Sequence, residues 1–268
     1  MKKGYLTLSA VLFFLLSIFS AIAHTGGEKL TAWQRLGLPD PNQIILFSGI
    51  IVLLSISYAL LMRKELTESH KKALYIIVAI SAIIGTIYLS GATVYLNQKS
   101  WSGGPVHWHA DFEIWVCGEQ IDVVDPTGFR NLVGEETMHE HGDNRIHIEG
   151  VIFDKEDATL AEFFEALGGR FEAGATDREG RTYGYLQVPT EEGLKGWGQP
   201  AVLSLFESLC NGKIARWTVF INGKLVENNE APDYVISPWQ TVPPGDTIKF
   251  VFTEVHPSLV KPNLGVPP

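Results

Sequence analysis

The stretch DFEIWVC at residues 111–117 alternates polar and apolar side chains, and RIHIE at residues 145–149 repeats the alternation. A period of two indicates a β-strand with one buried face. A turn and a return strand over 118–124 follow the first stretch, which predicts a hairpin. In the second stretch, His147 and Glu149 share one face of the strand.

A helix is predicted after the second strand, at residues 159–167. Thr159 and Glu162 have the spacing of a capping box. The apolar side chains that follow recur at helical intervals, and the pair Gly168-Gly169 ends the pattern. Residues 170–200 are rich in glycine and charge and are interpreted as an insertion, and residues 201–209 as a short second helix.

The C-terminal part carries the signals of a further hairpin and a last strand. Asn222-Gly223 between two apolar stretches is a strong hairpin signal. A turn at 244–246 leads into an apolar stretch at 247–252. The predicted fold is therefore α+β, with a mixed sheet and one packed helix.

Five of the eight histidines fall within 41 residues. Two His-x-His pairs each place two imidazoles on one side of an extended chain. Neutral imidazole is a common metal ligand. The predicted ligands are His107, His109, His139, His141 and His147.

The predicted strands suggest how these side chains meet. One pair immediately precedes the first strand, and the other lies in a loop at 125–144 that leads into the strand with His147. If these strands are neighbours, the imidazoles converge on a site for Zn(II), Cu(II) or Ni(II), with copper or zinc expected. The alternative is a set of hydrogen-bonded polar residues without affinity for metal.

Other side chains near the histidines are candidates for supporting roles. Asp111, Glu140 and Asp143 are candidates for orienting the imidazoles. His24 joins the candidate ligands because cleavage after Ala23 would give it a free amine next to its imidazole. The further candidate ligands are Glu113, Met138, Glu149 and His24.

The two cysteines, Cys117 and Cys210, are expected to form a disulfide, since they are the only available pair in a domain predicted to lie outside the cytoplasm. A thiolate metal ligand is the alternative, because Cys117 follows His109 by eight residues.

Three apolar runs precede the polar part of the chain. The first has the layout of a signal peptide or signal anchor. The second and third are long enough to cross a bilayer, and four basic residues in the loop between them predict a cytoplasmic loop. The predicted organisation is a signal segment at 1–23, an extracytoplasmic segment at 24–42, a transmembrane hairpin at 43–98 with its loop at 63–72, and an extracytoplasmic domain at 99–268.

The charge is divided between these parts. Residues 100–268 hold 12 basic and 26 acidic residues, a net charge of −14, whereas residues 1–99 have a net charge of +5. Such an acidic domain repels phosphate backbones, so nucleic acid is not expected as a partner. The expected partners are the lipid bilayer and a neighbouring membrane protein.

Three functions fit these observations. The chain has no nucleophile elbow, phosphate loop, dinucleotide fingerprint or His-Glu-x-x-His motif, so catalysis is less expected than binding. A membrane-anchored protein for copper or zinc capture, delivery or sensing needs the fewest assumptions. An interaction module that docks a membrane protein is the alternative, and a metal-dependent hydrolase or oxidoreductase is the third.

Several resemblances accompany this interpretation. The stretch FINGK at 220–224 and PGDTI at 244–248 resemble the closing part of β-grasp (ubiquitin-like) domains, which implies a helix across one face of a mixed sheet. HWHADF at 107–112, HEHG at 139–142 and IHIEG at 146–150 resemble an uncharacterised group of membrane-anchored archaeal and bacterial ectodomains, which implies no activity.

A cupin is the competing resemblance. His107 and His109 followed by Glu113 match the core of the first cupin motif. The next glycine, Gly118, comes too early, and the helix at 159–167 does not suit a jelly roll. Glu113 is nevertheless kept as a candidate ligand.

Overall fold

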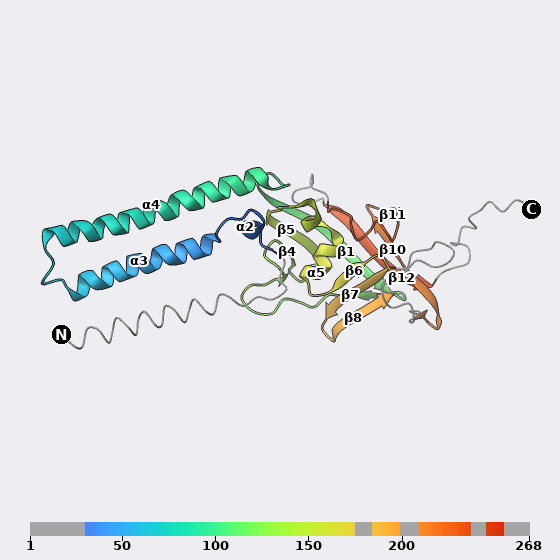
Figure 1. The fold of residues 1–268 in the computed structure, drawn as a ribbon. Helices are drawn as coiled ribbons and strands as arrows, with labels where there is room; N and C mark the ends of the chain where they lie inside the picture. The colour runs from blue at the N-terminus through green and yellow to red at the C-terminus, as the bar shows by residue number, and fades with distance from the viewer. Residues whose placement is uncertain (1–29, 175–183, 199–208, 237–244, 255–268) are drawn as a thin grey trace, which may run out of the picture. The chain divides into compact units, whose positions relative to one another are not determined.

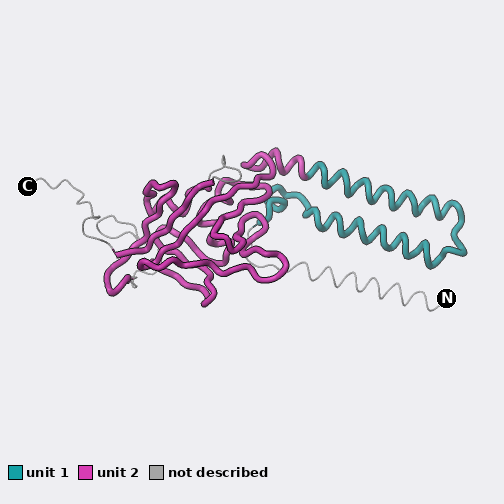
Figure 2. The backbone as a smooth tube through the Cα atoms, turned by 180° about the vertical axis from the view of Figure 1, so that it is seen from behind, with its two compact units in different colours: residues 1–92 teal, residues 93–268 magenta. Residues whose placement is uncertain are grey.

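The computed structural model describes residues 30–174, 184–198, 209–236 and 245–254. The chain divides into two compact units, residues 1–92 and 93–268 (Figure 2). The predicted signal segment, His24 and the short helix predicted at 201–209 lie outside the described residues, apart from Leu209, which begins a strand.

The first unit contains the short helix α2 (Ala32–Arg35), α3 (Pro41–Leu61) and most of α4 (Glu68–Lys99). Asp40 caps α3, because its side chain accepts a hydrogen bond from the Asn42 amide at 2.7 Å. Pro41 occupies the first turn, where its missing N–H costs nothing. Because α4 begins at Glu68, the second half of the loop predicted at 63–72 is helical.

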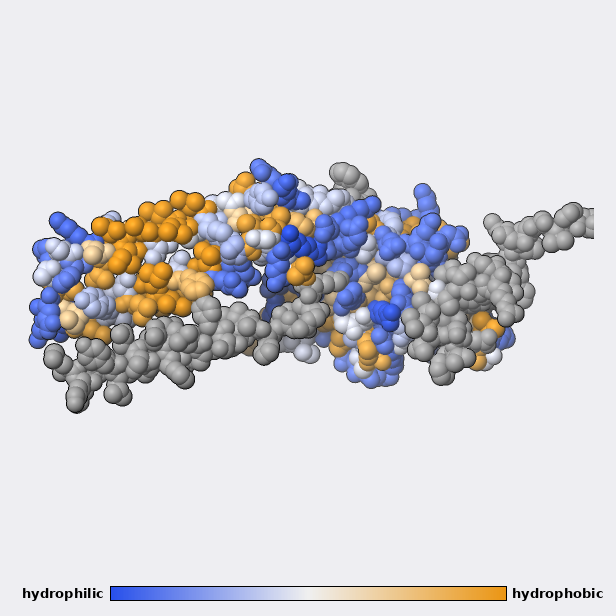
Figure 3. Space-filling model, viewed as in Figure 1, coloured by the Kyte–Doolittle hydropathy of each residue, from blue (hydrophilic) through white to orange (hydrophobic). Residues whose placement is uncertain are grey.

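Both α3 and α4 are long and apolar enough to cross a membrane. A helix rises about 1.5 Å per residue, so 21 residues span about 30 Å, the thickness of a bilayer's hydrocarbon core. Their apolar side chains are largely exposed, as the orange atoms along both helices show in Figure 3. A soluble protein would bury such surfaces, so the prediction of two candidate spans is confirmed.

The second unit is built on a mixed sheet (Figure 1). The strands run in the order β11-β10-β12-β1-β5-β4-β3, with β2 paired to β1 and β9 to β10. β1 and β12 are parallel, and the other pairs are antiparallel. The bounds are β1 (Pro105–Val116), β2 (Glu119–Ile121), β3 (Val133–Gly134), β4 (Met138–Glu140), β5 (Arg145–Val151), β9 (Leu209–Cys210), β10 (Lys213–Ile221), β11 (Lys224–Val226) and β12 (Asp246–Glu254).

One face of this sheet packs against a helix and a second sheet. The 3₁₀ turn η1 (Lys155–Ala158) leads into α5 (Leu160–Ala166), and a three-stranded sheet contains β6 (Arg170–Glu172), β7 (Tyr185–Thr190) and β8 (Gly193–Gly198). The ring of Phe164 on α5 lies 5.2 Å from that of Phe250 on β12, measured between centroids. The α+β class predicted from the sequence is therefore confirmed.

The alternation along β1 divides its side chains between two faces. Trp108, Ala110 and Phe112 are buried in the core, where Phe112 lies 5.3 Å from Phe163 between ring centroids. The alternate residues of the strand, His107, His109 and Asp111, must therefore project from the opposite face. This second face carries the candidate metal ligands.

Two local predictions are corrected, and one sheet was not predicted. β1 begins at Pro105, so His107 and His109 lie inside the strand rather than before it. The segment predicted as a loop at 125–144 contains β3 and β4, because β4 pairs with β5. The sequence did not predict strands at residues 170–200, whose described part forms the second sheet.

The predicted helix and hairpin form where expected. The Thr159 side chain caps α5 by accepting a hydrogen bond from the Glu162 amide at 3.3 Å. Asn222 and Gly223 join β10 to β11 with positive φ angles of 52° and 74°, the conformation that the tight turn requires.

In the structure, Cys117 and Cys210 form a disulfide across a sequence separation of 93 residues. Cys117 follows β1 directly, and Cys210 belongs to β9. The bond ties the end of a central strand to the edge of the sheet. Neither sulfur is a free thiolate, so the alternative role as a metal ligand is wrong in this state.

We predict that Phe164→Ala lowers the free energy of unfolding of the β domain by about 3–5 kcal/mol, because it removes a fully buried ring from the core. Thermal or denaturant unfolding of the chain in detergent measures this. The matched control is Phe129→Ala, since Phe129 is fully exposed and its removal leaves no cavity. Equal losses from both variants would contradict the described core.

Candidate metal centre

The register of three neighbouring strands aligns three histidines in one row. His109 on β1 is paired with His147 on β5, and His147 is also paired with His139 on β4. Directly paired residues in antiparallel strands have side chains on the same face. The row therefore crosses the face of the sheet that is opposite to the core.

The remaining two histidines lie beside the ends of this row, His107 on β1 and His141 just after β4. His107 precedes His109 by two residues, and their Nε2 atoms lie 3.1 Å apart. His141 follows His139 by two residues, and their Nε2 atoms also lie 3.1 Å apart. The His147 ring lies between the two pairs, with centroid distances of 4.7 Å to His109 and 4.5 Å to His141.

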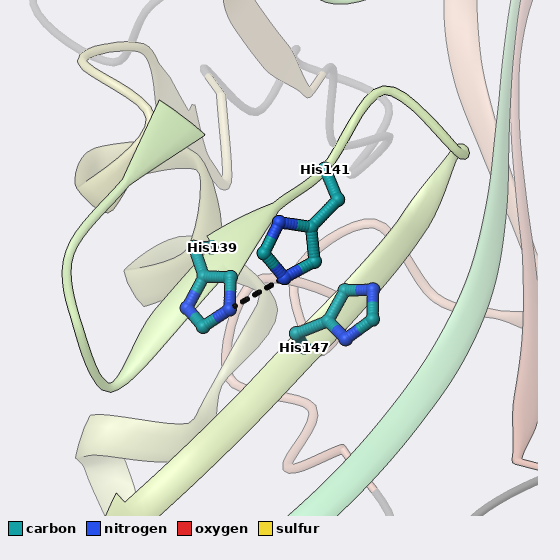
Figure 4. A group of neighbouring side chains, drawn as sticks. All are labelled: His139, His141 and His147. Atoms are coloured by element: carbon teal, nitrogen blue, oxygen red, sulfur yellow. Dashed lines mark hydrogen bonds between the residues drawn. The ribbon is translucent and has the colours of Figure 1, made fainter. Parts of the chain in front are cut away.

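Three of these histidines form the compact group of potential metal ligands. His139, His141 and His147 each offer a ring nitrogen, and these nitrogens lie within 4.8 Å of one another. Figure 4 shows the rings of His139 and His141 side by side, with that of His147 next to them on the neighbouring strand. In the described residues, this is the group whose geometry suits a metal ion.

Backbone carbonyls hold the two rings of the His139–His141 pair. The Nδ1 of His139 lies 3.1 Å from the Glu135 carbonyl oxygen, and that of His141 contacts the Asn131 carbonyl oxygen. A carbonyl only accepts hydrogen bonds, so each Nδ1 must carry the proton. In a neutral imidazole the other nitrogen, Nε2, then has a free lone pair.

This pairing of tautomers creates an electrostatic conflict in the metal-free chain. Two lone pairs that face each other at 3.1 Å repel unless a cation lies between them. A proton would convert one ring to a charged imidazolium, and burial of His139, which is 3% exposed, opposes that charge. A metal ion resolves the conflict and leaves both rings neutral.

The distances within the group suit one ion for the His139–His141 pair but not yet for all three rings. Metal–nitrogen bonds of about 2.0–2.1 Å place two nitrogens on one ion at most about 4 Å apart. The separation in the His139–His141 pair lies inside this limit, and the largest separation in the group, 4.8 Å, exceeds it. The His147 ring therefore has to turn toward the pair when the ion binds.

Burial tunes these imidazoles toward their neutral form. Loss of water is the largest cause that lowers the pKa of His109, His139 and His147 below the ordinary value of 6.5. The neighbouring rings, His107 for His109 and His141 for His139, lower the pKa further. Neutral imidazoles are the form that binds metal.

The other candidate ligands are spread over both faces. Glu149 is paired with His107, and its Oε1 lies 3.4 Å from His107 Nδ1. Met138 is paired with Ile148 on the core side and is 2% exposed, so it does not lie with the imidazoles. Glu113 accepts hydrogen bonds from the Trp115 and Lys249 side chains, about 13 Å along β1 from His109.

Of the three carboxylates predicted to orient imidazoles, Asp143 contacts one. Its Oδ2 lies 3.3 Å from His147 Nε2. Asp111 instead accepts a hydrogen bond from Arg145 at 2.6 Å. Glu140 is fully buried, and its Oε1 accepts hydrogen bonds from the backbone amides of Asp143 and Asn144 at 2.6 and 3.0 Å.

Glu140 thus stabilises the turn between β4 and β5 and does not contact an imidazole. The turn also needs Gly142, whose φ of +78° is unfavourable for other residues. The turn carries Asp143, whose carboxylate contacts His147. Among the described residues, no hydrogen bond reaches the buried Oε2 of Glu140.

Two contributors were not predicted from the sequence, the backbone carbonyls of Asn131 and Glu135. Every residue has a carbonyl, so the sequence has no signal for this role. Asn131 adopts a positive φ of 48°, which asparagine tolerates better than most residues, and this was the one local hint.

No family model, curated protein or solved structure matches this chain. The function of the chain is therefore inferred from the geometry and chemistry of the histidine group.

We predict that the metal-free β domain loses stability as the pH falls below about 6.5. The folded pKa values of His109, His139 and His147 are lowered, so the unfolded chain takes up protons at a higher pH than the folded chain. Their contribution is complete above the unfolded pKa and is lost as the pH falls through the folded values. Unfolding with a chelator present, at several pH values, measures this.

The control for that experiment is the triple variant His109→Gln, His139→Gln and His147→Gln. It should show a flatter dependence on pH between about 6.5 and 5, because glutamine does not titrate. An unchanged slope in the variant would assign the pH dependence to other groups.

We also predict that Glu140→Ala lowers the free energy of unfolding by about 1–3 kcal/mol, since two backbone amides of the turn lose the buried carboxylate that accepts from them. Thermal unfolding measures the loss, with Glu136→Ala as the control because that side chain is exposed. Should both variants lose the same small amount, the turn does not depend on Glu140.

Proposed function

We propose that this chain is a membrane-anchored protein that captures a copper or zinc ion on the outer side of the membrane. The ion is held by His139, His141 and His147. The observation that carries the proposal is the pair of Nε2 atoms 3.1 Å apart, both left with lone pairs by the carbonyl contacts of Nδ1.

The ligand type narrows the choice of metal. Imidazole nitrogens suit zinc and copper, whereas magnesium and calcium prefer oxygen. Three imidazoles with one open position form a common zinc arrangement, and copper binds such sites more tightly in the Irving–Williams order. Met138 lies on the core side, so no thioether biases the site toward Cu(I).

The charges around the two candidate spans support an extracytoplasmic position of the β domain. The residues between α3 and α4 and at the start of α4 include four basic side chains: Arg63, Lys64, Lys71 and Lys72. Such a loop faces the cytoplasm by the positive-inside rule. The end of α4, and the domain that follows, then lie outside, where the disulfide is stable.

The topology supports a β-grasp-like fold for the domain. The parallel pair β1 and β12 is central in the sheet, and α5 packs across the core face between the first and last strands. In such an arrangement the helix covers one face of the sheet and leaves the other face to other contacts. The histidine row occupies this face.

Capture is favoured over catalysis by the surroundings of the site. The site is a group of imidazoles, and the carboxylate that contacts it, that of Asp143, is engaged with His147. A carboxylate on the far side of a ligating imidazole orients the ring and raises its basicity. These features increase affinity for the ion and do not require a substrate.

The test is the binding of Zn(II) to the full chain in detergent. Zn(II) at 100 times its dissociation constant should stabilise the β domain by about 2.7 kcal/mol, because the ion binds the folded state. The double variant His139→Gln and His141→Gln should lose the tight site and this stabilisation. Chelator competition and thermal unfolding measure both effects.

The matched control is His70→Gln, since His70 lies at the start of α4, outside the β domain. It should bind Zn(II) as the wild type does. Undiminished tight binding by the His139/His141 variant would refute the proposed function.

A further inference from the structure

We propose that His107 and His109 form a second, weaker site for a divalent copper or zinc ion, next to the first. This inference builds on the proposed function and adds a second ion to it. The second site includes the most accessible of these side chains, His107. His147 lies between the two sites.

The geometry of the His107–His109 pair repeats that of His139 and His141. In both pairs the Nε2 atoms are 3.1 Å apart, and the ring centroids are 4.6 Å apart. Two nitrogens on one tetrahedral ion lie about 3.3 Å apart, given bonds of about 2.0–2.1 Å. Each pair can therefore bind one ion with little movement.

The partners of His107 leave its Nε2 available for a metal. Its Nδ1 lies 3.4 Å from the Glu149 carboxylate, which can only accept while it is ionised. The proton of neutral His107 is therefore on Nδ1. A carboxylate, an imidazole and a metal in this order are a common arrangement in metal sites.

His109 is not satisfied by protein partners alone. It is 8% exposed, and its buried Nδ1 has no hydrogen-bond partner among the described residues. Its Nε2 can donate to His107, but the Nδ1 lone pair is then buried without a donor. An ion between the two Nε2 atoms replaces this contact by two coordinate bonds, and the Nδ1 of His109 then carries the proton and still has no partner among the described residues.

As the side chains stand, the two pairs are too far apart to contact the same ion. The pairs belong to β1 and β4, which are separated by β5, so their backbones lie about two strand spacings, roughly 9–10 Å, apart. The group of three nitrogens within 4.8 Å contains neither His107 nor His109. Five imidazoles in this row therefore divide into a group of three and a pair.

The exposure of the ligands indicates which of the two sites binds an ion more weakly. The His107 side chain is 55% exposed, whereas that of His147 is 11% exposed. A pair of imidazoles completed by water binds an ion more weakly than three imidazoles do. The pair should therefore be the weaker of the two sites.

The experiment titrates the full chain in detergent with Zn(II), in excess Mg²⁺ to block carboxylate sites. The wild type should bind two equivalents with different affinities. His107→Gln with His109→Gln should lose the weaker equivalent alone, and His139→Gln with His141→Gln the tighter one. His70→Gln should keep both.

The outcomes separate the two proposals. A wild type that binds one equivalent, or a His107/His109 variant that keeps two, overturns the second site and leaves the three-histidine site standing. A His139/His141 variant that keeps the tight equivalent overturns the proposed function instead. If the His107/His109 variant does not fold, His107→Gln alone provides the test, because this exposed side chain tolerates substitution.

A second measurement tests whether the sites are neighbours. Two Cu(II) ions within about 5–10 Å, one to two strand spacings, should broaden each other's electron paramagnetic resonance signal. The broadening should vanish in the His107/His109 variant with one Cu(II) bound. Two unbroadened Cu(II) signals in the wild type would show that the second ion lies elsewhere.

Discussion

The pairing of β5 with β1 on one side and with β4 on the other is the constraint on which the site depends. It places His147 opposite both His109 and His139. A slip of one residue in either pair would send these imidazoles into the core and bring apolar side chains to the outer face. The core holds the register, because Ile146 and Ile148 are fully buried on the other face of β5. Metal binding is thus a consequence of hydrophobic packing on the opposite side of the sheet.

Glycines, a buried carboxylate and hydrogen-bond acceptors near the histidines then orient the imidazole rings that the strand register brings together. Gly245 allows β12 to begin beside β1, since a Cβ at this position would overlap the His109 carbonyl oxygen. Glu140 and Gly142 shape the turn that carries His141. Carbonyl groups hold the Nδ1 atoms of one pair, and a carboxylate faces that of His107. Backbone and carboxylate acceptors therefore select the tautomer in which Nε2 can bind a metal.

The sequence predicts those elements whose hydrophobic pattern repeats over many residues or whose turn needs specific residue types. The alternation in β1 and β5, the capped helix α5 and the Asn222-Gly223 hairpin all follow local rules. β4 could not be predicted, because a strand of three residues has no period to detect and exists through its pairing with β5. Met138 was expected near the imidazoles by proximity in sequence, but alternation turns it to the core. The carbonyls that orient His139 and His141 are invisible in a sequence, since they depend on tertiary structure alone.

The most direct test of the central claim is X-ray absorption at the zinc edge of the full chain loaded with one equivalent of Zn(II). We expect a coordination shell containing three imidazole nitrogens at about 2.0–2.1 Å, and the loss of imidazole scattering from the tight site in the His139/His141 variant. Coordination by oxygen alone, or an unchanged spectrum in that variant, would contradict it.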